Sequence, residues 1–357
     1  MRTFRPFIAV VASVAVLAAC GGGGGDDKSS AKKKSTTTAA APPSTETTVA
    51  PGTAPLTGAP AADPAKLARP ALVVKIDNAP KARPQAGINQ ADLVVEEAVE
   101  GGVTRLFVVF HSQDADPVGP VRSSRSTDLA LAVPLNRPLF AYSGTNSVFQ
   151  KQIAAAPVID ISPNAFPGGY RRQPGRPSPY NLFSSTPTLF SKAPAGASGP
   201  PALFSYRPAG AAPTGGEAAG AVTLEFPGRV LTTARWTWDA ASGTYRRTQR
   251  VSPTEGAATP HVDAAGQPVA PRNVVIALVN YTDTGIRDQS GEPVPEAHLE
   301  GEGEAWVLTG GTLIKGKWRK TGRDARIEIV DGAGKPIPLT PGQTWMELPR
   351  PGGAKVG

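Results

Sequence analysis

The sequence predicts an α+β fold, with a mixed α/β N-terminal domain followed by a predominantly β C-terminal domain after a disordered N-terminal tether. Three observations support this class. Short runs of β-branched and aromatic residues recur from residue 71 onward. Helical patterns occur only between residues 123 and 156. The 357 residues include 39 glycines and 38 prolines, roughly twice the average usage, which is typical of a chain rich in turns and linkers. A long helical bundle is therefore excluded.

The first twenty residues have the pattern of an export signal. Arg2 and Arg5 precede an apolar run from residue 7 to residue 19, which ends in Leu-Ala-Ala-Cys20. Such a run is about 20 Å long as a helix, shorter than the roughly 30 Å core of a bilayer. The last four residues resemble the lipobox of bacterial lipoproteins, in which the cysteine receives a lipid. We therefore expect a signal peptide over residues 1–19 and lipidation, with palmitate as an acyl chain, at Cys20. An ordinary secretory signal with a chance cysteine is the alternative.

Residues 20–69 have the composition of a linker. Five glycines are followed by a charged stretch and then by a tract of Ser, Thr, Ala and Pro with no apolar periodicity. Such a segment cannot bury enough apolar surface to offset its chain entropy. Cys20 is the only cysteine, so an intrachain disulfide or a zinc site made of several thiolates is excluded.

The predicted α/β domain covers residues 70–205. Two β-rich runs flank Gly101 and Gly102, which indicates a hairpin, and the second run is apolar on both faces, which indicates a central strand. Serines after a Gly-Pro turn and a later proline delimit the first helix. The expected strands are residues 71–76, 92–100, 103–110 and 158–161, and the expected helices are residues 123–133 and 147–156.

The predicted β domain covers residues 220–349. Helical patterns disappear after an Ala, Pro and Gly-rich connection, and short strands alternate with turns. The expected strands are residues 235–239, 244–248, 273–280, 305–309, 312–318 and 325–330. They form either a small barrel or sandwich, or the completion of the sheet begun in the first half.

The most suggestive constellation is a group of arginines near a turn that leads into the first predicted helix. Guanidinium groups beside free N–H groups at a helix start suit a phosphate or a carboxylate. The candidate anion-binding residues are Arg83, Arg105, Arg122, Ser123 and Arg125. The alternative is that these arginines form structural ion pairs with nearby acids, above all Glu96, Glu97 and Glu100.

Four acidic residues near these arginines are candidates for acid/base chemistry or for a divalent metal: Asp77, Asp92, Glu96 and Glu97. Their spacing selects no role, so no catalytic residue and no cofactor are assigned. Residues 311–317 have the spacing of a phosphate-binding loop, but Trp318 stands where Ser or Thr is needed. The His261-x-Asp263 pair lies in a turn-rich stretch, and the chain has only three histidines.

Several segments resemble the YerB-like lipoproteins, a bacterial family built from the two parts of domain-of-unknown-function family 3048. The first part is recognised in Lys75-Ile-Asp-Asn, Arg83-Pro-Gln-Ala-Gly, Glu100-Gly-Gly-Val-Thr-Arg, Gly119-Pro-Val-Arg-Ser-Ser-Arg and Pro179-Tyr-Asn. The second part is recognised in Tyr245-Arg-Arg, His261-Val-Asp, Arg272-Asn-Val-Val, Gly316-Lys-Trp and Pro341-Gly-Gln-Thr-Trp. The resemblance implies an envelope location and a two-part architecture, and it implies no reaction.

The charge balance gives no support to nucleic-acid binding. The formal net charge of +8 falls to +6 when Arg2 and Arg5 leave with the signal peptide, and this modest excess suits anionic envelope polymers or lipid headgroups equally well. We expect a lipid-anchored protein on the extracytoplasmic face of the cell membrane that binds an anionic envelope ligand or an envelope protein. The alternative is an enzyme of envelope glycan assembly, similar to a phosphotransferase, that uses the same arginines and aspartates.

Overall fold

The computed structural model describes residues 50–288 and 291–357. The predicted signal peptide, Cys20 and most of the predicted tether lie outside these residues. The predicted α+β class is confirmed, because strands dominate and the few helices lie in the first half.

The largest element is an eleven-stranded mixed sheet whose order is β18-β17-β16-β13-β19-β2-β3-β1-β4-β5, with β8 beside β17. Its strands are β1 Leu72–Asp77, β2 Leu93–Ala98, β3 Thr104–Phe110, β4 Leu139–Ala141, β5 Ile159–Asp160, β8 Glu217–Ala218, β13 Asn273–Ala277, β16 Gly301–Thr309, β17 Thr312–Lys320, β18 Glu328–Val330 and β19 Thr344–Leu348. Both halves of the chain contribute, because β2 pairs in parallel with β19. The strands of the second half therefore extend the sheet of the first half.

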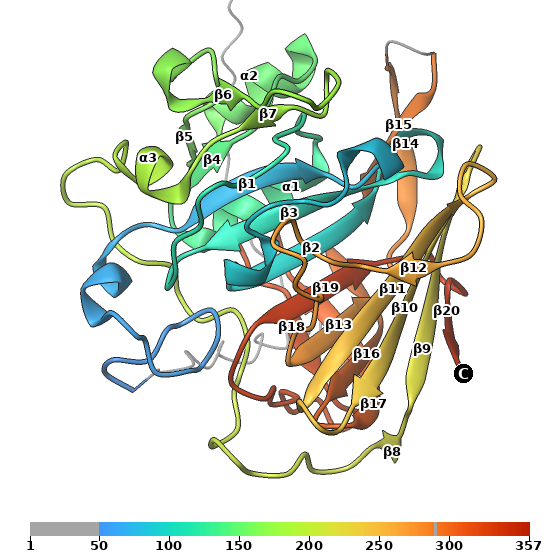
Figure 1. Ribbon diagram of the computed structural model, residues 1–357. Helices are drawn as coiled ribbons and strands as arrows, with labels where there is room; N and C mark the ends of the chain where they lie inside the picture. The colour runs from blue at the N-terminus through green and yellow to red at the C-terminus, as the bar shows by residue number, and fades with distance from the viewer. Residues whose placement is uncertain (1–49, 289–290) are drawn as a thin grey trace, which may run out of the picture. The chain divides into compact units, whose positions relative to one another are not determined.

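A five-stranded antiparallel sheet packs against this large sheet (Figure 1). Its strands are β9 Ala221–Pro227, β10 Leu231–Asp239, β11 Thr244–Ser252, β12 Thr259–Pro260 and β20 Ala354–Val356. The indole rings of Trp236 on β10 and Trp345 on β19 meet edge to face between the sheets, with centroids 5.3 Å apart. Two ribbons lie outside both sheets: β6 Arg171–Arg172 with β7 Leu182–Phe183, and β14 Tyr281–Arg287 with β15 Pro293–Ala297.

The helices are short. They are α1 Thr127–Ala132, α2 Ser147–Ala155 and α3 Thr186–Phe190, together with the 3-10 turns η1 Pro64–Ala68, η2 Pro80–Ala82, η3 Ile88–Gln90, η4 Glu100–Gly102, η5 Val133–Leu135 and η6 Pro167–Gly169. Asn146 caps α2 by accepting hydrogen bonds from the N–H groups of Val148 and Phe149. The second helix thus agrees with the predicted range of residues 147–156.

The first helix begins four residues later than the predicted range of residues 123–133. The cause is that the preceding segment is bonded to its neighbours in an extended form. The N–H of Arg122 donates to the carbonyl of Lys75 at 2.8 Å, and the N–H of Ser124 donates to the carbonyl of Gly144 at 3.1 Å. Backbone groups used in this way are not available as a helix start.

The direction of the strands sets one edge of the large sheet apart. Strands β13, β19, β2, β1, β4 and β5 all run the same way, because β1 and β2 are both antiparallel to β3 and the other pairs along this set are parallel. The carboxyl ends of these strands therefore lie at one edge of the sheet, where ligands bind in many sheets of this kind. Asp77 ends β1 at this edge, and Arg105 enters β3 there.

Candidate functional site

Three of the predicted arginines meet at the carboxyl edge of β1 and β2. Arg105 lies on β3 directly opposite Asp77 of β1 and Glu97 of β2. Arg122 and Arg125 belong to the extended segment that precedes α1 and crosses this edge. The structure thus brings together residues that are 17 to 20 positions apart in the sequence, around the end of one strand.

Arg122 holds the outermost position of the three. Its Nε donates to Oδ2 of Asp77 at 2.7 Å, and its guanidinium carbon lies 6.0 Å from the centre of the Tyr180 ring. Its side chain is 27% exposed, whereas the side chain of Asp77 is 6% exposed. The cation therefore faces solvent and the carboxylate lies beneath it.

Arg125 and Arg105 share a second carboxylate, that of Glu100. The Nε of Arg125 donates to Oε1 of Glu100, and Nη2 of Arg105 lies 3.7 Å from Oε2 of the same residue. Nη1 of Arg105 also donates to the carbonyl of Ser123 at 3.0 Å. Three guanidinium groups thus face two carboxylates at this surface, an excess of one positive charge that the buried Lys75, Glu97 and Asp128 beneath them, one cation and two acids, offset.

Burial and the neighbouring Arg125 shift the pKa values of Arg105 and Glu100. Burial and then the charge of Arg125 lower the pKa of Arg105 to about 10, which leaves it protonated at neutral pH. Burial opposes ionisation of Glu100, but the hydrogen bond and the charge of Arg125 outweigh it and hold the pKa of Glu100 below its usual value. A bound anion at this edge would relieve the repulsion among the arginines.

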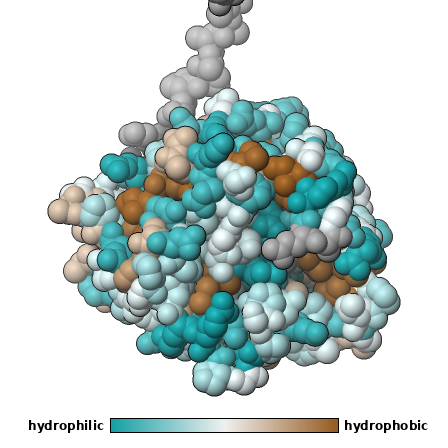
Figure 2. Space-filling view, turned by 90° about the horizontal axis from the view of Figure 1, so that it is seen from above, coloured by the Kyte–Doolittle hydropathy of each residue, from teal (hydrophilic) through white to brown (hydrophobic). Residues whose placement is uncertain are grey.

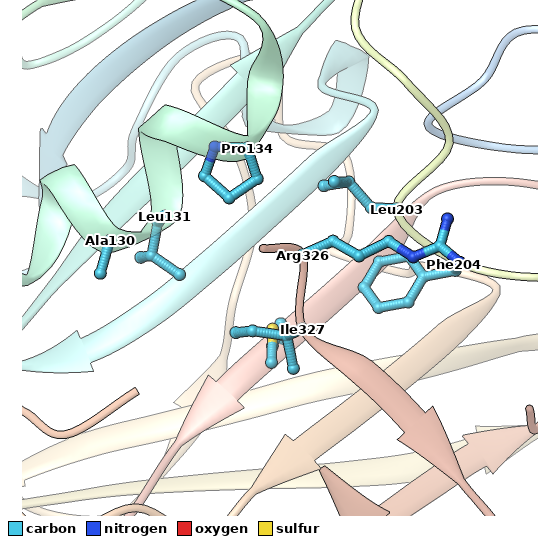
Figure 3. Close-up of a pocket in the computed structure, with 8 residues that line it drawn as sticks. Ala130, Leu131, Pro134, Leu203, Phe204, Arg326 and Ile327 are labelled. Atoms are coloured by element: carbon cyan, nitrogen blue, oxygen red, sulfur yellow. The ribbon is translucent and has the colours of Figure 1, made fainter. Parts of the chain in front are cut away.

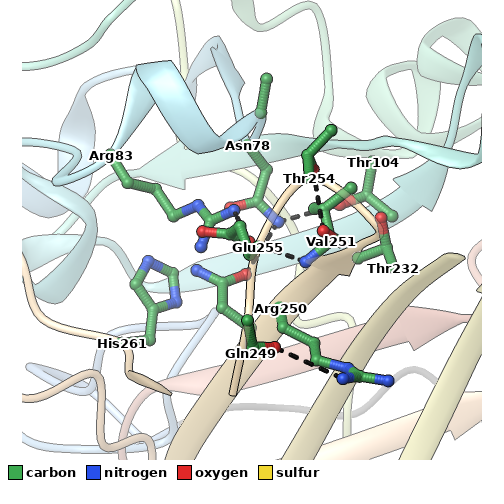
Figure 4. Close-up of polar contacts among 12 residues, drawn as sticks. Asn78, Arg83, Thr104, Thr232, Gln249, Arg250, Val251, Thr254, Glu255 and His261 are labelled. Carbon is green, nitrogen blue, oxygen red and sulfur yellow. Dashed lines mark hydrogen bonds and ion pairs between the residues drawn. The ribbon is translucent and has the colours of Figure 1, made fainter. Parts of the chain in front are cut away.

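Two predicted residues lie elsewhere. Arg83 pairs with Glu255 of the second half at 2.9 Å (Figure 4), away from the other three arginines. Asp92 precedes β2 at the opposite end of the sheet, where its carboxylate accepts hydrogen bonds from the N–H groups of His111 and Ser112. Burial raises the pKa of Asp92, which fits a residue that organises a turn inside the protein.

Glu97 belongs to a buried triad below the arginines. The ammonium group of Lys75 donates to Glu97 and, at 2.6 Å, to Oδ1 of Asp128 on α1. All three side chains are fully buried. Burial raises the pKa of Glu97 to about 7, with the Lys75 charge opposing the rise and the Asp128 charge adding to it. The other oxygen of Asp128 accepts the N–H of Arg125 at 2.7 Å, so the triad supports the segment that carries the site.

Glu96 points to the opposite face of β2, as expected for consecutive strand residues. There it pairs with Arg247 of β11, whose side chain is fully buried. Nη1 of Arg247 contacts Nδ1 of His261 at 2.9 Å, and the indole N–H of Trp236 donates to Glu347 of β19 at 2.8 Å. Burial lowers the pKa of His261 well below its usual value, because the neutral ring is favoured there. This network joins the two sheets.

The network continues through uncharged side chains. Asn78 donates to Thr104 at 2.8 Å and to Gln249 at 3.1 Å (Figure 4), and Gln85 contacts Nε2 of His261 at 2.8 Å. Every residue here is buried, and three polar atoms of the network, Nε of Arg247, Nε2 of Gln249 and Oε2 of Glu347, have no hydrogen-bond partner in the described part of the chain.

A small, mostly apolar cavity lies among the described residues. It lies between α1 and the strands of the second half, with Leu131, Phe204, Ile327 and Met346 in its lining (Figure 3). Arg105, Arg122 and Arg125 do not line this cavity. Among residues 50–288 and 291–357, no group of three His, Cys, Asp or Glu side chains has the arrangement of a metal site. No helix in that part of the chain is long and apolar enough to cross a bilayer.

Sequence reasoning missed three residues of these clusters. The patterns place Lys75 in a predicted strand and in one family segment and Asp128 inside the predicted helix of residues 123–133, and they give Glu347 no role. A lysine inside an otherwise apolar strand run is the one signal that could have revealed the triad, because a buried ammonium requires acidic partners.

Comparisons with known proteins agree with this architecture. Residues 56–197 match the model described as "Protein of unknown function (DUF3048) N-terminal domain", and residues 222–346 match the corresponding C-terminal domain. The chain is 29% identical over 301 residues to the protein named "Putative lipoprotein YerB" of Bacillus subtilis (strain 168), which covers 83% of this chain and 85% of that protein.

The fold is also similar to a solved one. The crystal structure of the YerB protein from Bacillus subtilis superposes with a TM-score of 0.71 and 25% sequence identity, covering 85% of this chain and 99% of that one. The residues that match the two family models share one continuous sheet, because β2 in the first matched region pairs with β19 at the end of the second. The chain therefore belongs to the two-part DUF3048 family of proteins of unknown function, the family of the lipoprotein YerB.

Proposed function

We propose that this protein is a lipoprotein tethered through Cys20 to the extracytoplasmic face of the cell membrane, and that it binds an anionic envelope ligand at the carboxyl edge of β1. The tether is supported by the sequence of the first twenty residues and by the name of the Bacillus relative. Two acyl chains on one cysteine suffice for stable anchoring.

The single observation that carries the binding proposal is the arrangement of charge at the edge. Arg122 is the most exposed member of a cluster in which three guanidinium groups outnumber two nearly buried carboxylates. Arg122 has one hydrogen bond among the described residues, through Nε, so the outer nitrogens of its guanidinium can receive a phosphate or a carboxylate.

The experiment is a thermal-shift screen of the full chain in a nonionic detergent. The probes are inorganic phosphate, a soluble polyprenyl-phosphate mimic, glycan fragments and divalent metals. We expect phosphate compounds to raise the melting temperature of wild type and not that of Arg122→Gln. Arg235→Gln, which removes an exposed arginine from β10, is the matched control and should respond like wild type. An equal response in Arg122→Gln would count against the site.

An envelope glycan-assembly enzyme, similar to a phosphotransferase, is the second candidate. The observation that favours it is the contact of Asp77 with Arg122, because a carboxylate beside an arginine could position or deprotonate a phosphoryl acceptor. Both oxygens of Asp77 are already engaged, one by Arg122 and one by the N–H of Ala79 at 2.8 Å. We therefore favour binding. Turnover of a polyprenyl-pyrophosphate substrate that is lost in Asp77→Asn would favour the enzyme instead.

A further inference from the structure

A second group of arginines lies beside the proposed site, on the ribbon formed by β6 and β7. Residues 170–181 contain three arginines and no acidic residue. Arg171 and Arg172 are exposed, and both lie on β6. Figure 2 shows the molecule from above, and hydrophilic residues cover most of that face, with hydrophobic ones in small separate patches. The sequence reasoning had not singled out these arginines.

Backbone contacts place this ribbon next to Arg122. The N–H of Val121 donates to the carbonyl of Leu182 on β7 at 2.7 Å, and Leu182 is the register partner of Arg172. Arg172 donates to the side-chain oxygen of Asn181 at 2.7 Å, and the residue before Asn181 is Tyr180, which faces Arg122. Two strand spacings separate the backbones at residues 122 and 172, which is roughly 10 Å.

The connection between β6 and β7 is held in place. Arg176 donates to the carbonyls of Ala82 at 2.6 Å and Pro84 at 3.0 Å, and its guanidinium lies over the Phe183 ring. Arg176 thus acts as an anchor, while the other two arginines of the ribbon face solvent. A ribbon fixed in this way presents its charges at a constant separation from Arg122.

The charges of the ribbon are only weakly neutralised. Arg171 pairs with Asp116 at 3.1 Å, but both side chains are more than half exposed, and such surface pairs exchange readily with ions from solution. The site and the ribbon together hold six arginines and three carboxylates: Arg105, Arg122, Arg125, Arg171, Arg172 and Arg176 against Asp77, Glu100 and Asp116. With the buried Lys75, Glu97 and Asp128 beneath them, seven cations face five carboxylates, a net charge of +2.

We propose that the ligand is a linear polyanion, with successive anionic groups at Arg122, Arg172 and Arg171, the last two on opposite faces of β6. This inference rests on the proposed function, because it extends the same site. Arg122 is bonded to Asp77, Arg172 to Asn181 and Arg171 to Asp116, so the three guanidinium groups are held by separate partners and are not gathered around one point. A chain with repeated anions can engage several of them at once, and its second contact is then intramolecular.

The test compares a chain with its monomer. Binding of inorganic phosphate, of a long-chain linear polyphosphate and of polygalacturonate to the full chain in nonionic detergent is measured by titration calorimetry at one fixed salt concentration. We expect wild type to bind a polyanion at least about tenfold more tightly than phosphate. In the double variant Arg171→Gln/Arg172→Gln, the affinity for the polyanion should fall by about that factor, and the affinity for inorganic phosphate should fall by less than about twofold. Preference between polyphosphate and polygalacturonate identifies the anion as phosphate or carboxylate.

The control is Arg235→Gln/Arg246→Gln, which removes two exposed arginines from the five-stranded sheet, one of them paired with an acid as Arg171 is. It should leave both affinities unchanged. Equal losses in the control, an unchanged affinity of the ribbon variant for the chain, or ribbon-dependent binding only to phosphatidylglycerol vesicles would overturn the inference. If one of these results is found while phosphate binding still depends on Arg122, the proposed function stands and only the polyanion inference fails. If wild type does not bind phosphate, both the proposed function and the polyanion inference fail.

Discussion

The neighbouring residues Glu96 and Glu97 of β2 take part in two different buried ion pairs. Consecutive residues of a strand point to opposite faces. Glu96 therefore meets Arg247 between the two sheets, while Glu97 meets Lys75 beneath the arginine cluster. A buried carboxylate without a cation would be strongly destabilising. The same dipeptide thus requires two separate cations, one from each half of the chain.

Glu97 predicts a measurable dependence of stability on pH. Its pKa of about 7 in the folded protein lies above the ordinary value of 4.5, so the folded state binds more protons than the unfolded chain between these values. The contribution of Glu97 to the free energy of unfolding therefore falls as the pH rises through this window, by about 3 kcal/mol on full ionisation. Glu97→Gln cannot ionise and leaves Lys75 balanced by Asp128.

The measurement is urea unfolding at pH 5 and pH 7.5. We expect Glu97→Gln to lose less stability than wild type between the two pH values. Glu302→Gln, an exposed residue of β16, serves as the control and should follow wild type. If the free energy of unfolding falls equally with pH in wild type and Glu97→Gln, the pKa of Glu97 is not raised in the folded protein.

At the scale of elements, the connection between β2 and β3 explains why two glycines stand together. Both have a positive φ, +67° at Gly101 and +87° at Gly102. A Cβ at Gly102 would lie 2.1 Å from the carbonyl oxygen of Val230, whereas the nearest atom to a Cβ at Gly101 would be 3.7 Å away on the Arg229 side chain. The turn therefore requires backbone freedom at both glycines and close approach at only one.

Substitution of the two glycines should separate these requirements. Gly101→Ala is expected to lower the free energy of unfolding by about 1 kcal/mol, the cost of a left-handed conformation. Gly102→Ala should cost clearly more, roughly 3 kcal/mol, because the backbone of residues 228–230 must also move. Denaturant unfolding of both variants is the measurement, and equal losses would be inconsistent with close contact at Gly102.

Element prediction from sequence succeeds where a pattern is complete within a few residues. The β-branched runs of β1, β3 and β13 and the capped helix α2 are of this kind. It misses β9 and β19, because the first follows a Gly and Ala-rich connection and the second follows a Pro-Gly turn with mixed polarity. Nor does any local pattern indicate that β19 pairs with β2, some 250 positions away.

The candidate site follows the same rule. Arg105, Arg122 and Arg125 belong to neighbouring elements of one sheet edge, so their proximity in sequence agrees with their proximity in space. Arg83 also lies close in sequence, yet its partner Glu255 is 172 positions away in the other half. A sequence shows which residues carry charge, while long-range pairing decides which of them meet.

At the scale of the whole molecule, the buried Arg247 network holds the two sheets together. The guanidinium of Arg247 lies against both Trp236 and Trp345, with its carbon 5.6 and 5.2 Å from the ring centres. It pairs with Glu96 and lies 3.8 Å from Glu347, whose pKa burial raises well above the usual value. Removal of this one cation would leave the buried carboxylate of Glu96 without its counter-charge.

Arg247→Met is therefore expected to lower the free energy of unfolding by about 3–5 kcal/mol. Its neighbour on β11, Arg246, is exposed and pairs with Asp239, so Arg246→Met should change stability by less than about 1 kcal/mol. Denaturant unfolding of the two variants provides the comparison. Similar small effects would mean that the sheets are held by apolar packing alone.

We expect Arg122 to receive an anion in competition with Asp77, which binds the same guanidinium. Titration calorimetry with inorganic phosphate measures this competition. Asp77→Asn keeps the acceptor for the N–H of Ala79 and removes the competing charge. We expect opposite shifts, with phosphate affinity falling at least about tenfold in Arg122→Gln and rising several-fold in Asp77→Asn. Unchanged affinity in both variants, or a fall in both, would contradict this competition.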